Sequence, residues 1–246
     1  IADIAVDCKH ILRPEMDQEE VAYIFRQYYL VSAPVVNADG RLIGFVSVED
    51  IVDIIEEEAE EDLMLLSGVQ SRDTYYALGK TVKRRFPWLW ISMLSSFVSA
   101  FIVSQFSGTI THIVALAALM PVVSAVVGNA GMQTLTVVVC SMVRNQVTSR
   151  NKYRVIIKEV LVCSLNGLLL GALGGLGVYA TYSDMHLGMV FGGAMASCFV
   201  MAGLVGALIP IIFKWFKIDP AVASSAFVAT TTDIIGFTVF LGLATI

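Results

Sequence analysis

The chain has 246 residues, of which 57% are hydrophobic and only 15% are charged. Soluble domains carry about 45–50% apolar and about 25% charged residues, so this composition excludes a purely soluble globule. The net charge of −5 conceals an uneven distribution. Residues 1–75 carry 17 acidic and 5 basic side chains, whereas residues 76–246 carry 4 acidic and 11 basic side chains. This split predicts an acidic domain in water followed by a membrane-embedded domain.

The first 62 residues have the pattern of a small α/β unit. Apolar residues at helical spacing predict a helix over 19–30, and Asp17 precedes it as a candidate N-cap. Apolar runs at 33–36 and 42–46 flank an Asp-Gly pair, which supplies the positive φ of a hairpin turn. A helix and a hairpin in this order predict a compact, water-facing domain.

A second helix is predicted directly after the hairpin, because Ser47 and Asp50 have the spacing of a capping box. The run P-V-V-x-x-x-G-x-L-x-G-x-V-S and this helix resemble the end of a CBS domain, over residues 1–55. CBS repeats come in pairs and the chain begins with Ile1, so we expect a first repeat upstream. The resemblance leaves open whether such a pair binds ATP.

An acidic connector follows, with seven acids among residues 53–62. If the helix continues through this segment, like charges lie one turn apart and repel each other. A bound hard cation would reverse that repulsion, because Mg²⁺ and Ca²⁺ prefer carboxylate oxygens. The alternative is a solvated acidic face without metal.

Five stretches are long and apolar enough to cross a hydrocarbon core about 30 Å thick. They are residues 87–106, 110–142, 156–182, 187–213 and 221–246. The fold predicted is therefore an all-α membrane bundle of five transmembrane helices, preceded by the small α/β domain and a linker over 63–86. Lys and Arg gather before the first span and after the second and fourth. The positive-inside rule then places the N-terminal domain in the cytosol and the C-terminus outside.

The second span is unusual in both length and composition. Pro121, Gly128 and Gly131 loosen a helix, while Asn129 and Gln133 bring two amides onto one helical face. Freed carbonyls at membrane depth persist only where protein or a water-filled cavity covers them. An ion path and a kink with interhelical hydrogen bonds both fit this pattern.

Asp233 is the acid expected inside a span. The other acids after residue 76 are Glu159 near a span end, Asp184 in a loop and Asp219 before Pro220, as an N-cap. A charged carboxylate inside a membrane costs at least about 2.5 kcal/mol, so it usually faces an interior or a water path. Hydroxyl-bearing residues surround Asp233, which favours a cation site; a protonated, hydrogen-bonded Asp is the alternative.

Together these motifs resemble the MgtE family of magnesium channels. The resemblance is carried by the CBS hairpin, the acidic connector, Pro121…Gly128-Asn129-x-Gly131-x-Gln133, and Asp219-Pro220-Ala221 leading to Thr230-x-x-Asp233-x-x-Gly236. It implies a homodimer in the bacterial inner (plasma) membrane, with 63–86 as linker or plug and 87–246 as the pore domain. Mg²⁺ is implied both as the ion carried and as a regulator.

The resemblance also implies metal-ion roles for particular residues. In the pore, Asp233 is similar to the family's aspartate for hydrated Mg²⁺, the Ala229 carbonyl is a second group, and Asn129 lies on the lining motif. Regulatory Mg²⁺ is implied at Asp50, Asp53, Glu58, Glu61 and Asp62, with Asp17 and Glu19 matching more weakly. Ions bound at these acids would hold the channel shut.

Two other functions remain alternatives. One is a proton- or sodium-coupled divalent cation transporter, because an intramembrane Asp suits a proton relay. The other is a CBS-regulated membrane sensor without transport. An enzyme is disfavoured, since the sequence has neither a nucleophile–base arrangement nor a phosphate-cradling glycine loop with Lys. Nucleic-acid binding is disfavoured by the acidic soluble part.

Overall fold

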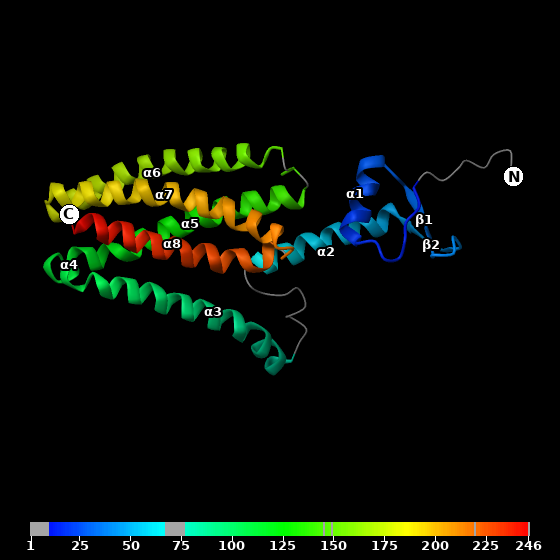
Figure 1. Cartoon of the computed structure of the whole chain (residues 1–246), viewed down its shortest axis with the longest axis horizontal. Helices are drawn as coiled ribbons and strands as arrows, with labels where there is room; N and C mark the ends of the chain where they lie inside the picture. The colour runs from blue at the N-terminus through cyan, green and yellow to red at the C-terminus, as the bar shows by residue number, and fades with distance from the viewer. Residues whose placement is uncertain (1–9, 67–76, 145, 149, 219, 246) are drawn as a thin grey trace. The chain divides into compact units, whose positions relative to one another are not determined.

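The computed structural model describes residues 10–66, 77–144, 146–148, 150–218 and 220–245. Contacts divide the chain into two compact units, Ile1–Met64 and Leu65–Ile246. The first contains helices and a β-hairpin, and the second contains helices throughout the part described (Figure 1). The predicted fold class, a helical membrane bundle after a small α/β domain, is confirmed.

The first unit is built around an antiparallel hairpin. Its elements are α1 (Gln18–Tyr28), β1 (Ser32–Val36), β2 (Leu42–Ser47) and α2 (Val48–Leu66). Gly40 has a φ of 75°, as the Asp-Gly pair predicts. Both helices contribute to one small core, formed by Leu12, Val21, Ala22, Phe25, Ala33 and Ile51.

Side chains cap both helices of this unit. The Asp17 carboxylate accepts a hydrogen bond from the Glu19 backbone N–H at 3.0 Å, so the predicted N-cap of α1 is confirmed. Ser47 and Asp50 form the predicted capping box. The Ser47 N–H and hydroxyl donate to Asp50 Oδ2 at 2.8 and 2.6 Å, and the Asp50 N–H donates to Ser47 Oγ at 3.3 Å.

Among the described residues, the second unit contains five helices with the length and apolarity of membrane spans. They are α3 (Leu78–Gln105), α5 (Ala115–Val143), α6 (Lys152–Tyr182), α7 (Met185–Trp215) and α8 (Pro220–Ala244). A short helix, α4 (Ser107–His112), lies between α3 and α5. The predicted number of spans is therefore confirmed.

Two span boundaries differ from the predictions. The second span was expected over 110–142, but its first residues belong to α4, because the backbone leaves the helical region at Ile113 (φ −124°, ψ 80°). The first span, expected from residue 87, is continuous with helical residues of the preceding linker, because α3 begins at Leu78. Its first turns carry Lys and Arg, which disfavour membrane burial yet leave helix formation unaffected.

The second span remains one helix where loosening was expected. Pro121 lies inside α5, and the backbone stays helical through Gly128 and Gly131. A proline in a helix removes one hydrogen bond, but neighbouring helices can compensate for that loss inside a membrane. The polar side chains of this segment therefore project from one continuous helix, α5.

Helix α7 is central to the packing of the second unit. It contacts α5, α6 and α8, while α3 contacts mainly α8 (Figure 1). The largest core cluster draws on α5, α7 and α8, and includes Val123, Ala194, Cys198 and Phe240, which are 0% exposed. This core packs α5, α7 and α8 against one another.

Four glycines bring α6 and α7 into backbone contact. A Cβ at Gly171 would lie 2.6 Å from the Gly192 carbonyl oxygen, and a Cβ at Gly175 would lie 2.7 Å from the Gly188 oxygen. The reverse approaches, from Gly188 and Gly192, are each 2.8 Å. Only glycine fits these positions, as expected for close helix pairs in lipid. We call these four residues the glycine seam.

Alanine at the glycine seam should destabilise the second unit. We expect Gly192→Ala to reduce stability by about 1–3 kcal/mol, because the new methyl group meets backbone that cannot rotate away. Thermal unfolding in detergent, followed by Trp fluorescence, measures this change. Gly193→Ala is the control, since a Cβ there meets nothing within 4 Å. Equal melting temperatures for the two variants would contradict the steric account.

The capping box predicts a pH dependence. Its hydrogen bonds from Ser47 hold the pKa of the Asp50 carboxyl below its usual value of 3.8. A depressed pKa contributes stability that is present above 3.8 and is lost as pH falls through the lower folded value. Carboxyl NMR titration should show the Asp50 pKa rising towards 3.8 in Ser47→Ala. An unchanged midpoint would contradict the assignment of Ser47 as the cause.

Candidate metal-ion site

The candidate ion site lies where α5 and α8 pack together. Asp233, in the middle of α8, is half-buried, and its Oδ1 accepts a hydrogen bond from the Ser124 hydroxyl of α5 at 2.5 Å. Beside this pair, Val123 is fully buried, and a Cβ at Gly236 would lie 3.8 Å from its Cγ1. The carboxylate therefore belongs to an interface between two helices rather than to a lipid-facing surface.

Gly131 permits the close approach of α5 to α8. A Cβ at this position would lie 3.0 Å from side-chain methyl groups of both Thr232 and Val228. Gly128, in the same motif, has no neighbour within 4 Å of its Cβ position. The two glycines of the second-span motif thus differ: Gly131 sets helix spacing, and Gly128 leaves open space on its face of α5.

The Ala229 carbonyl, one turn before Asp233, is already engaged within α8. Its oxygen accepts a hydrogen bond from Thr232 Oγ1 at 2.9 Å, and the same hydroxyl donates to the Val228 carbonyl at 2.9 Å. Thr232 is only 2% exposed, so its hydroxyl is held in place. An ion near Ala229 would meet a carbonyl that already has a side-chain donor.

The amides of Asn129 and Gln133 share the exposed face of α5, as predicted. This face continues with Thr136 and Cys140, which are also exposed. Within the described part of the chain, neither amide side chain makes a hydrogen bond. We call Asn129, Gln133, Thr136 and Cys140 the polar stripe. Asn129 and Asp233 thus lie on neighbouring helices without a bond between them.

The acidic connector forms the second half of α2. Glu58 accepts a hydrogen bond from the Gln18 side chain, while Asp53 and Glu61 are exposed. The helix does continue through this segment, so the like charges lie one turn apart. Position 62 is helical, but the Asp62 side chain lies outside the described residues.

Those of the predicted regulatory acids whose side chains the structure describes do not converge in one place. Among the residues that the structure describes, no three His, Cys, Asp or Glu side chains come together as a metal site. Asp17 and Asp50 are engaged as helix caps, and the hydrogen bonds from Ser47 that lower the pKa of Asp50 occupy one of its two oxygens. The cap bonds of Asp17 and Asp50 engage one carboxylate oxygen of each residue.

The remaining acids of the second unit have structural places. Asp184 caps α7 by accepting from the His186 and Leu187 N–H groups at 2.9 and 3.1 Å. Glu159 is 7% exposed on α6, close to Cys163. Asp219, predicted to cap the last span, lies outside the described residues, and α8 begins at Pro220.

The sequence analysis did not single out two residues of the site, Thr232 and Ser124. Thr232 belongs to the hydroxyl-rich run before Asp233, but its carbonyl partners follow only from the helix that it occupies. Ser124 lies on a different span and has no motif around it. Its one signal is a hydroxyl in an otherwise apolar stretch, seven residues before Gly131 on the same helical face.

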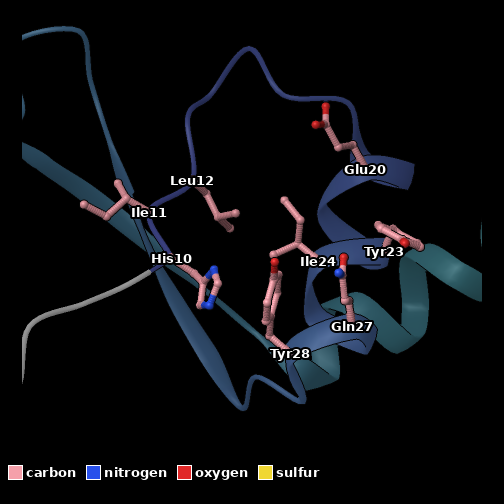
Figure 2. Close-up of a pocket in the computed structure, with 8 residues that line it drawn as sticks. All are labelled: His10, Ile11, Leu12, Glu20, Tyr23, Ile24, Gln27 and Tyr28. Carbon is pink, nitrogen blue, oxygen red and sulfur yellow. The ribbon is translucent and has the colours of Figure 1, made fainter.

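The first unit also contains a groove between residues 10–12 and α1 (Figure 2). Its volume is about 390 Å³, and its walls are His10, Ile11, Leu12, Glu20, Tyr23, Ile24, Gln27 and Tyr28. The rings of His10 and Tyr28 lie 3.9 Å apart, centroid to centroid, at 31°. The one carboxylate among these eight residues is Glu20, which is not one of the predicted metal-binding acids.

Comparisons with known proteins agree with both units. Residues 120–243 match the MgtE family, described as a divalent cation transporter, and residues 2–57 match the CBS domain. The magnesium transporters MgtE of Thermus thermophilus, Enterococcus faecalis and Bacillus subtilis are 35%, 32% and 31% identical to this chain over 239, 232 and 230 residues. These matches cover 95%, 93% and 93% of this chain but 52%, 50% and 51% of the relatives, so the chain spans about half of their length. The chain belongs to the MgtE family of divalent cation transporters.

Proposed function

We propose that this chain conducts Mg²⁺ across the bacterial plasma membrane, as the ion-conducting part of a homodimeric MgtE-type channel. The observation that carries the proposal is the Asp233 carboxylate, half-buried between two membrane helices and bonded to a hydroxyl. A carboxylate in this environment is unfavourable without a compensating function. The relatives that match this chain are named magnesium transporters.

The polar stripe on α5 supports a pore between two copies. Asn129 and Gln133 are exposed in the single chain, although amide groups facing lipid would lose their hydrogen bonds. A second copy related by a two-fold axis would cover this face and enclose a water-filled path. In that arrangement, the stripe lines the path and α8 contributes Asp233 from each copy.

Hydrated Mg²⁺ fits a site of this kind. Mg²⁺ gives up its water reluctantly and usually keeps several water ligands. Two Asp233 carboxylates would match its charge through those waters, and the Ala229 carbonyls would add neutral acceptors. Conduction requires binding that is weak enough for the ion to leave, which outer-sphere contacts provide.

The acidic connector is the proposed sensor of internal Mg²⁺. Repulsion along α2 would be relieved by ions that bridge Asp50, Asp53, Glu58, Glu61 or Asp62 to another acidic surface, with Asp17 and Glu19 as weaker contributors. The described acids form no closed metal site on their own, which favours such a bridge between surfaces. Bound ions would close the pore through their higher affinity for the closed state. The positive-inside rule places this sensor in the cytosol and the C-terminus outside.

Removing the Asp233 charge should strongly reduce transport. We expect Asp233→Asn to reduce Mg²⁺ flux into liposomes by about tenfold or more, because the site loses its charge match to the ion. Asp184→Asn is the matched control, since it changes an acid of the same unit that caps a helix. Equal flux in Asp233→Asn and the unsubstituted chain would contradict the channel. Flux that follows an imposed pH gradient would instead indicate a proton-coupled transporter.

Neutralising the connector should remove inhibition by internal Mg²⁺. Single-channel recording of the Glu58→Ala, Glu61→Ala, Asp62→Ala triple variant should show openings that persist at millimolar internal Mg²⁺. The reason is that fewer bridging carboxylates lower the affinity difference between closed and open states. Neutralising Glu15 and Asp39, which lie outside the connector, provides the control. Unchanged inhibition in the triple variant would reject the connector as the sensor.

A further inference from the structure

We propose that Ser124 determines ion specificity at Asp233, by holding one carboxylate oxygen and leaving the other for the water shell of Mg²⁺. This inference rests on the proposed ion site. Its starting point is the 2.5 Å hydrogen bond from Ser124 Oγ to Asp233 Oδ1. Among the described residues, no other side chain donates to this carboxylate, so Oδ2 keeps all of its acceptor positions.

The bond joins two helices that pack closely at this level. On one side, Val123 is fully buried, with its Cγ1 3.8 Å from the position that a Gly236 Cβ would take. On the other side, Gly131 packs against Val228 and Thr232, with 3.0 Å from its Cβ position to each side chain. Ser124 therefore holds the Asp233 side chain from a fixed position.

Three other serines in the membrane helices donate within their own helix. Ser141, Ser164 and Ser197 donate to the carbonyls of Val137, Val160 and Gly193 at 2.7, 2.6 and 2.8 Å. This back-bonding is the usual arrangement for a hydroxyl in an apolar helix. Ser124 instead donates across the α5–α8 contact to a carboxylate, and a bond from a hydroxyl to an ionised acceptor is stronger and shorter than a neutral one.

A carboxylate held in this way discriminates between divalent ions. Ca²⁺ takes six to eight oxygen ligands and often binds both oxygens of one carboxylate, whereas Mg²⁺ keeps waters and needs one acceptor for each of them. With Oδ1 engaged by Ser124, the carboxylate is a poorer bidentate ligand. Its free Oδ2 still accepts from a water of hydrated Mg²⁺. Ser124 thus acts as a specificity-determining positioning residue.

The test compares Ca²⁺ block of Mg²⁺ flux in liposomes containing the whole chain. The measured quantity is the Ca²⁺ concentration for half-block divided by the half-saturating Mg²⁺ concentration. We expect Ser124→Ala to lower this ratio about tenfold, because one charged hydrogen bond is lost. Ser124→Thr keeps the hydroxyl and should retain the original ratio. Ser164→Ala is the matched control, because it removes a part-buried hydroxyl that back-bonds within α6.

A binding measurement keeps the test independent of flux. Calorimetric titration of the purified chain with Mg²⁺ and with Ca²⁺ should show the same shift in relative affinity. Ser124→Cys, nearly isosteric and only a weak donor, replaces the alanine variant if that variant melts early. An unchanged Ca²⁺ to Mg²⁺ ratio in the Ala or Cys variant, with Asp233→Asn inactive, would overturn the role of Ser124 alone. Full activity of Asp233→Asn would overturn the ion site itself.

Discussion

Polar groups inside a bilayer have no water to bond with, and this constraint organises the second unit. Some hydroxyls satisfy it by donating to carbonyls of their own helix. Others form hydrogen bonds with a side chain of another helix: Ser124 with Asp233, Ser95 with Thr230, and Thr134 with the Cys163 thiol. Among the described residues, the Ser99 hydroxyl is the buried side-chain group without a partner. The polar contacts between helices gather around α5 and α8, where the proposed ion path lies.

The bundle therefore combines two kinds of helix contact with different chemistry. At the glycine seam the backbone of α6 meets the backbone of α7, and the Tyr179 Cβ lies 3.3 Å from the position that a Gly188 Cβ would take. Between α5 and α8, close approach at Gly131 is combined with a hydroxyl–carboxylate bond at Ser124 and Asp233. The first contact needs only small residues, whereas the second needs particular functional groups at particular heights in the membrane. The proposed ion site lies at the second contact, where a hydroxyl–carboxylate bond links the two helices.

Much of the fold could be predicted because its signals are local. Apolar length predicts the spans, the Asp-Gly pair predicts the positive φ at Gly40, and the Ser47–Asp50 spacing predicts the capping box. The break at Ile113 was missed, because no proline marks it and composition alone does not distinguish one helix from two. Asp233 could be selected from the sequence, since an acid in a span is rare. Ser124 could not, because its partner is 109 positions away and only the packing of α5 on α8 brings them together.

The glycine seam has a consequence for motion as well as for stability. Interfaces between helices usually change arrangement when their side chains exchange rotamers and repack. A seam of backbone atoms at Gly171, Gly175, Gly188 and Gly192 has no rotamers to exchange. We therefore expect the α6–α7 hairpin to move as one unit at this height when other helices shift. We expect rearrangement of the bundle to be absorbed elsewhere. Hydroxyl pairs link α3 to α8 at Ser95–Thr230 and α4 to the residue after α8 at Thr109–Thr245, and such bonds can break and re-form.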